Sequence, residues 1–319
     1  MPPLPPEQPR ASATLFEVEA PRIMENGFVR IAGQDFFGQA VHSPNGRFLL
    51  AWRDQSTFVQ EDGTRSVKPG RFLMYEGPVL RAEGVLDRPH DGKVADNGRF
   101  ILNDWGNSGE LSGAFHAFEP DGTAILSRTF SANLNNNGLA PDGRIAVCQT
   151  CNAPNSPDSS ILAVFDLETA RDLYGWNPTS GWASSYAFPA GGEQIALSYT
   201  RGGTYLYALD GTFLEEARWT SDQLREGVTY VAKNLLAAHG AALPADIAAD
   251  MVSGFEGRLA DEGLEGRDRA QVLKLFGQCR EAQGNATEAL RLYQDALALD
   301  PKVGLKRRVE QMRRDNVGR

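Results

Sequence analysis

The chain has 319 residues, of which 41% are hydrophobic and 23% are charged, and its formal net charge is −9. These values are ordinary for a soluble globular protein, and the length fits two domains better than one. The acidic balance argues against a phosphate-binding surface spread over the whole protein, and three cysteines in so long a chain exclude a disulfide framework. No window approaches roughly 18 uninterrupted apolar residues, so we expect a soluble, cytoplasmic protein without a membrane partner.

The first residues have the composition of a leader. Residues 1–12 hold five prolines and no apolar run of signal-peptide length, which predicts a disordered segment. Two strand-like runs follow at 14–19 and 27–31, and Asn26-Gly27 marks the turn between them. We expect this strand pair to belong to the sheet region that comes next.

A glycine turn followed by a short apolar run recurs four times along residues 44–197. The copies are Pro44–Arg47 before Phe48–Trp52, Asp96–Arg99 before Phe100–Asn103, Pro141–Arg144 before Ile145–Gln149, and a decayed Pro189–Gly192 before Gln194–Leu197. Successive copies are 52, 45 and 50 residues apart, counted at Arg47, Arg99, Arg144 and Gln194. A period of this size is typical of the blades of a β-propeller.

The second half of each copy supplies two more strands around a tight turn. Four strands per copy predict four blades at 36–86, 87–130, 131–177 and 181–219. A propeller protects its sheet edges only if the ring closes, so we expect about five blades, with the N-terminal strand pair supplying a partial one. A half-ring closed by a second copy of the chain, or by the helical domain, is the alternative.

The hydrophobic period changes from strand-like to helical at residue 220. Leu224, Val228, Val231 and Leu235 form a helical stripe after Ser221, an expected N-cap, and Pro244 opens a second stripe. Further helices are predicted at 267–283 and 287–299 and after Pro301. Short connections between them indicate an antiparallel stack, so we expect a β domain over 13–219 and a helical domain over 220–319.

Residues 270–300 resemble a tetratricopeptide repeat. The matching residues are Leu273, Phe276, Gly277, Gly284, Ala289, Tyr293, Ala296 and Pro301. Arg280 stands where that family usually has an aromatic, which indicates an atypical or terminal repeat. The upstream turns at 43–47 and 140–144 are similar to those of WD40-like and TolB-type propellers. Together these resemblances imply a β-propeller of about four to five four-stranded blades followed by an α-helical array.

Cys148 and Cys151 form the only metal-like spacing in the chain. They supply two of the four ligands of a tetrahedral zinc site, and the four histidines are scattered one to a region. The pair also ends a strand rather than opening a helix, where thiolates are stabilised. We therefore expect free or packed thiols and no cofactor, with Cys279 as a packing residue.

Two groups of exposed side chains are candidate contacts for a partner. Asn135 and Asn136 lie in an amide-rich segment, which fits either a ligand-binding rim or a turn with positive φ, and we favour the turn. Trp105 and Trp182 stand in glycine-rich surroundings and are expected to be exposed. The basic residues of the last helix, from Lys306 to Arg314, are expected to form a solvated outer face rather than a contact with nucleic acid or with an acidic partner.

These patterns favour a non-enzymatic scaffold that binds protein or peptide partners. Lys274, Gln278 and Glu281 lie off the packing stripe of their helix and are expected to line the groove of the helical array. The alternative is an enzyme or ligand-binding propeller with a site in its central channel, with or without a bound metal. A third reading is an assembly subunit that completes its propeller by self-association.

Overall fold

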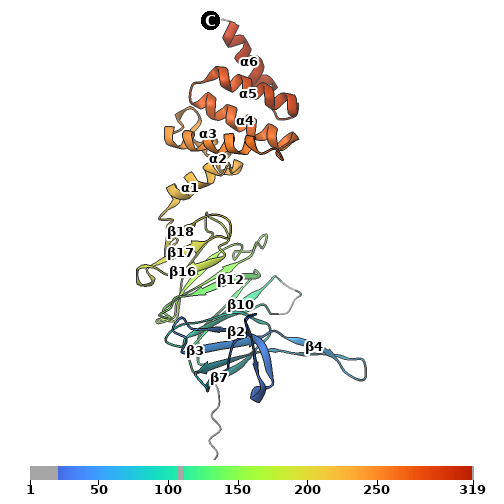
Figure 1. The fold of residues 1–319 in the computed structure, drawn as a ribbon, viewed down its shortest axis with the longest axis vertical. Coiled ribbons are helices and arrows are strands. Elements are labelled where there is room, and N and C mark those ends of the chain that lie inside the picture. The colour runs from blue at the N-terminus through green and yellow to red at the C-terminus, as the bar shows by residue number, and fades with distance from the viewer. Residues whose placement is uncertain (1–20, 107–108, 110, 318–319) are drawn as a thin grey trace, which may run out of the picture. The chain divides into compact units, whose positions relative to one another are not determined.

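The computed structural model describes residues 21–106, 109 and 111–317 (Figure 1). The predicted leader and the predicted strand at 14–19 lie outside these residues. The chain divides into two compact units between Leu214 and Glu215, rather than after Trp219. We call them the β unit and the helical unit.

Four antiparallel sheets make up the described part of the β unit, apart from one hairpin, and they occupy the positions of the four sequence repeats. The first contains β1 (Phe28–Ile31), β2 (Phe36–His42), β3 (Phe48–Arg53), β6 (Gly70–Glu76) and β7 (Val79–Leu86). The second contains β8 (Pro89–Val94), β9 (Phe100–Asp104), β10 (Gly113–Phe118) and β11 (Ala124–Phe130). The third contains β12 (Leu134–Leu139), β13 (Ile145–Thr150), β14 (Leu162–Asp166) and β15 (Arg171–Trp176). The fourth contains β16 (Ser185–Ala187), β17 (Gln194–Ser198) and β18 (Thr204–Ala208).

Apolar side chains bury each sheet against the next. Phe72 of the first sheet packs with Phe100 of the second in one core, and Phe115 and Phe165 join the second sheet to the third. Val147 and Ile195 belong to the core between the third and fourth sheets. Because the inner sheets are covered on both faces, their central strands are continuous apolar runs rather than alternating ones.

The recurring turns tie neighbouring sheets together. The amide of Asn45 donates to the Asp96 carboxylate at 2.7 Å, and the amide of Asp96 donates to the carbonyl of Pro141 at 2.8 Å. Asn97 Nδ2 donates to the carbonyl of Asp142 at 2.8 Å. The repeated sequence therefore closes its own hairpin and also sets the spacing between successive sheets.

Removing the Asp96 carboxylate should destabilise the β unit. We expect Asp96→Ala to lower the free energy of unfolding by about 1 kcal/mol, because the Asn45 amide loses its acceptor. The control is Asp62→Ala, since Asp62 accepts from Thr64 within its own exposed turn and bonds to no other sheet in the described chain. Urea unfolding followed by tryptophan fluorescence would measure both variants, and equal losses would contradict a role for Asp96 between the sheets.

The sheets form an open row in which the first and the fourth lie at opposite ends (Figure 1). The predicted partial fifth blade is not found in the described chain, because β1 adds to the first sheet by pairing with β2. The face of the fourth sheet turned away from the third carries mostly small or polar side chains such as Ser185, Gln194 and Ser198, with Leu206 as a larger apolar one. Such a face gives little apolar area for another sheet to cover, which fits the end of a row.

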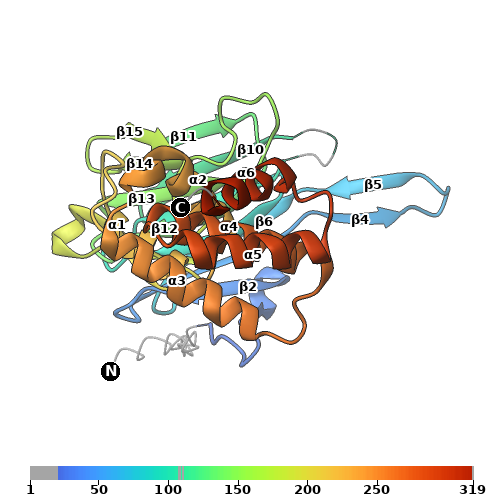
Figure 2. The same cartoon turned by 90° about the horizontal axis from the view of Figure 1, so that it is seen from above.

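A two-stranded hairpin projects from the first sheet (Figure 2). It consists of β4 (Ser56–Val59) and β5 (Arg65–Lys68) and was not among the predicted elements. Phe58, Val59 and Val67 are exposed on it, so no buried face imposes a hydrophobic pattern on its sequence. The insertion accounts for the longest interval between repeats.

The helical unit contains six helices in its described part. They are α1 (Glu216–Arg225), α2 (Thr229–His239), α3 (Ala245–Ala260), α4 (Gly266–Ala282), α5 (Ala286–Leu299) and α6 (Lys306–Val317). None of the helices described is long and apolar enough to span a membrane. A short 3-10 turn follows α2 at Gly240–Ala242, and two more occur in the β unit at Ala32–Gln34 and Ala190–Gly192.

Two predictions about the first helix of this unit are wrong. The stripe from Leu224 to Leu235 belongs to two helices, because Gly227 adopts a φ of 71° and ends the first of them. Ser221 is not an N-cap but lies inside α1, where its hydroxyl donates to Asp250 at 2.5 Å. The apolar residues keep helical spacing across the break between α1 and α2, so the sequence pattern did not reveal the break.

The pair α4 and α5 packs closely. A Cβ added to Gly277 would lie 2.4 Å from the ring of Tyr293, so only glycine allows this approach. Asn285 caps α5 by accepting from the Glu288 amide at 3.1 Å.

Candidate functional site

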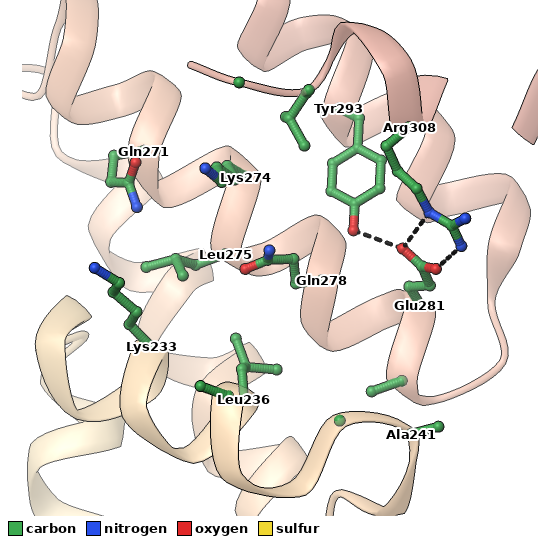
Figure 3. Close-up of a pocket in the computed structure, with 15 residues that line it drawn as sticks. Lys233, Leu236, Ala241, Gln271, Lys274, Leu275, Gln278, Glu281, Tyr293 and Arg308 are labelled. Carbon is green, nitrogen blue, oxygen red and sulfur yellow. Dashed lines mark hydrogen bonds and ion pairs between the residues drawn. The ribbon is translucent and has the colours of Figure 1, made fainter. Parts of the chain in front are cut away.

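A groove of about 740 Å³ opens in the helical unit between α2, α4 and α6 (Figure 3). Leu236 of α2, Leu275 of α4 and Leu305, the residue before α6, contribute apolar side chains to its lining. Polar and charged side chains surround them, so the groove combines an apolar surface with groups that fix orientation, as binding sites usually do. We call it the α4 groove.

The spacing of residues along α4 separates its packing face from its groove face. Leu273 and Phe276 are buried, whereas Lys274, Gln278 and Glu281 are partly exposed and line the groove. These three are four and three positions apart, which places them on one side of a helix. The structure thus brings together the three candidate residues that the sequence analysis assigned to a groove.

Glu281 anchors one end of the groove. Tyr293 donates its hydroxyl to a Glu281 carboxylate oxygen at 2.8 Å, and Arg308 of α6 forms an ion pair with the same carboxylate. Burial raises the pKa of Tyr293 to about 12, so the phenol stays a donor throughout the physiological range. Arg308 was expected on a solvated outer face but is partly buried here, where its guanidinium pairs with Glu281 of α4.

The opposite part of the groove leaves polar groups available. Lys274 donates to the carbonyl of Val303 at 2.9 Å, which links α4 to the segment before α6. Within the described chain, the side chains of Lys233, Gln271 and Gln278 make no hydrogen bond or ion pair, although all three line the groove. With Arg308 and Glu281 included, the lining carries three positive charges and one negative charge. A segment bound here would therefore meet side-chain amides that have no protein partner and a positive field.

Arg308, Lys233 and Gln271 are polar groove residues that sequence reasoning missed. Arg308 lies on a basic helix, and the sequence of that helix does not show which other helix it packs against. Lys233 lies on α2, which the apolar stripe did not separate from α1. The positions of Arg308 and Lys233 follow from how α6 packs on α5 and α2 packs on α4.

The two candidate tryptophans have different surroundings in the β unit. Trp105 is partly buried rather than fully exposed, and its ring stacks on His90 with centroids 3.9 Å apart. Trp182 is 50% exposed, and its indole donates to the carbonyl of Thr150 at 3.0 Å. Of the predicted exposed pair, only Trp182 therefore offers a largely accessible ring.

The amide-rich segment is strand β12 and not the turn that we favoured. Asn136 donates to the carbonyl of Ala183 at 2.7 Å and accepts from the hydroxyl of Tyr186 at 2.7 Å. These bonds connect the third sheet to the fourth, which explains an amide at this position without a ligand. Asn135 is exposed on the same strand and remains a candidate contact.

The cysteines occupy different environments. Cys148 is fully buried, and its thiol points toward Asn103 Oδ1 at 3.7 Å, whereas Cys151 is partly exposed. Burial raises the pKa of both thiols above the ordinary value. Cys279 is buried in α4, and its pKa is raised to about 11 by burial. No group of three or more metal-ligating side chains occurs among the residues that the structure describes.

The buried Cys148 thiol predicts a loss of stability at alkaline pH. The folded protein keeps the thiol proton because burial raises the pKa, while the unfolded chain releases it above about pH 8.5. The unfolded state then binds fewer protons, so the stability that is present below this pH falls as the pH rises. We expect urea midpoints between pH 7 and 10 to fall more steeply for the native protein than for Cys148→Ala, and parallel profiles would contradict this assignment.

Four successive antiparallel sheets followed by paired helices define the chain as a two-unit protein of mixed β and α structure. No family model matches the sequence, and no curated protein matches it. Among solved structures, the chain is similar to one described as the crystal structure of the C-terminal WD40 domain of Sif2. The similarity covers 53% of this chain and 45% of that one, at 9% identity and a TM-score of 0.34. The chain thus matches less than half the length of that structure.

Proposed function

We propose that the protein is a non-enzymatic interaction scaffold and that the α4 groove binds a segment of a partner protein. The observation that carries this proposal is the lining of the groove, where Lys233, Gln271 and Gln278 offer unused polar groups beside apolar side chains. A peptide or helix satisfies such a surface with its apolar side chains and its own polar groups. The groove is also the place where α4 presents a continuous row of side chains.

The pairing of α4 with α5 supports a tetratricopeptide-like reading of the helical unit. Gly277 permits the close approach of Tyr293, and Gly284 and Asn285 form the turn between the helices. In a repeat of this kind the first helix lines the concave surface, and α4 would supply that surface in this chain. In the β unit, Trp182 and Asn135 would add a second partner contact. We place the protein in the cytoplasm, where its three free thiols would remain reduced.

Photo-crosslinking tests this function at a single position. A benzoylphenylalanine replaces Gln278, and the protein is expressed in its source cells, irradiated and purified. We expect one predominant adduct whose peptide is identified by mass spectrometry. The matched control carries the same residue at Arg291, which is exposed on α5 outside the groove lining.

The variant Lys233→Glu supplies a second test in the same crosslinking experiment. It reverses an exposed charge in the groove lining that has no partner in the described chain, so folding should be preserved. We expect it to lower the yield of the Gln278 adduct about threefold or more. No adduct at Gln278, or equal adducts at Gln278 and Arg291, would overturn the proposal.

A further inference from the structure

A second cleft lies between α5 and α6, on residues that do not line the α4 groove. Its volume is about 340 Å³, and Leu297, Ala298 and Val309 form its apolar part. Lys306 and Arg313 also line it and are exposed. They are seven positions apart on α6, so they lie on one side of the helix and about 10 Å apart along its axis. The cleft therefore has an apolar floor between two positive charges.

Charge is segregated along the chain around this cleft. Residues 302–315 contain six Lys or Arg and two Asp or Glu, a net +4, whereas the whole chain is −9 and the remainder is therefore −13. Arg308 is paired with Glu281, and Arg314 lies 4.0 Å from Glu310. Lys306, Arg307 and Arg313 form no ion pair within the described chain. The outer side of α6 thus presents positive charge that the protein itself does not neutralise.

We propose that the α5–α6 cleft binds an acidic segment of a partner protein. An apolar side chain of that segment would lie against Leu297 and Val309, and its carboxylates would meet Lys306 and Arg313. A polypeptide fits better than a nucleic acid because the floor of the cleft is apolar and Glu310 lies between the two basic residues. The net −13 of the rest of the chain also opposes a long polyanion. This site is independent of the α4 groove, into which Arg308 points (Figure 3).

Fluorescence anisotropy with the full chain tests the cleft. The probe is a fluorescein-labelled 14-residue peptide, about four helical turns, with leucine on one helical side and glutamate flanking it. The comparison probes are the same peptide with every glutamate replaced by glutamine, and a labelled oligouridylate of similar length. We expect the acidic peptide to bind, the glutamine peptide to bind about tenfold more weakly, and the oligouridylate to bind more weakly than the acidic peptide.

A charge-reversed pair of variants locates the binding. Lys306→Glu combined with Arg313→Glu should weaken the acidic peptide about tenfold or more. The control combines Lys68→Glu with Arg267→Glu, two exposed residues that change the net charge by the same amount away from the cleft. Circular dichroism verifies that all variants keep the native helix content. Equal weakening in both double variants, unchanged binding in the cleft variant, or tighter binding of the oligouridylate would each overturn the proposal.

Discussion

Truncating Phe165 to alanine is expected to lower the free energy of unfolding of the β unit by about 3–5 kcal/mol. The side chain is completely buried in the core between the second and third sheets. Its ring stacks on Phe115 with centroids 4.5 Å apart and planes within 5°. Alanine removes this contact and leaves a cavity that two packed sheets cannot fill without moving.

Urea unfolding followed by tryptophan fluorescence measures the loss. Four of the five tryptophans lie before residue 214, so the signal reports mainly on the β unit. The matched control is Phe58→Ala, because Phe58 is 47% exposed on the β4–β5 hairpin. We expect its effect to stay within about 0.5 kcal/mol. Similar losses for the two phenylalanines would contradict a stability that depends on packing between successive sheets.

Replacing Gly254 by alanine should disrupt the packing of α3 against the end of α1. The new Cβ would lie 1.9 Å from the carbonyl oxygen of Leu224 and 2.9 Å from the amide nitrogen of Gly227. Both obstacles are backbone atoms, so the two helices must separate. We expect a loss of about 1–3 kcal/mol or more in the helical unit, despite the better helix propensity of alanine.

Gly257→Ala is the control on the same helix. Nothing lies within 4 Å of a Cβ at Gly257, so alanine should add about 0.5–1 kcal/mol of stability there. Thermal unfolding followed by circular dichroism at the helix band would measure the two variants. A Gly254→Ala variant that melts at or above the native temperature would show that α1 and α3 do not meet as described.

Local signals predicted the strands of the β unit well. The turns at Asn45-Gly46 and Asp142-Gly143 can be recognised in the sequence because they need glycine. Their glycines adopt positive φ, at 71° and 72°. The β4–β5 hairpin was not predicted because neither of its faces is buried. A buried face is what produces an alternating hydrophobic pattern in the sequence of a strand. The open row could not be predicted either, because closure of a ring depends on whether distant sheets offer apolar faces to each other.

In the helical unit, too, the local features of the candidate site were predicted and the features that depend on tertiary packing were not. Lys274, Gln278 and Glu281 could be assigned to one side of α4 because spacing along a helix is a local property. The partners of Glu281, Tyr293 and Arg308, come from two other helices, so their meeting depends on tertiary packing. The break at Gly227 was missed because the apolar spacing of the flanking residues runs through it.

Hydrogen–deuterium exchange tests binding in the α4 groove most directly. The purified protein is compared alone and saturated with the partner peptide identified by crosslinking at Gln278. Binding in the groove predicts slower exchange in α2, in α4 and at the start of α6, with the β4–β5 hairpin unchanged. Protection confined to the β unit, with α4 exchanging at its free rate, would contradict a partner site in this groove.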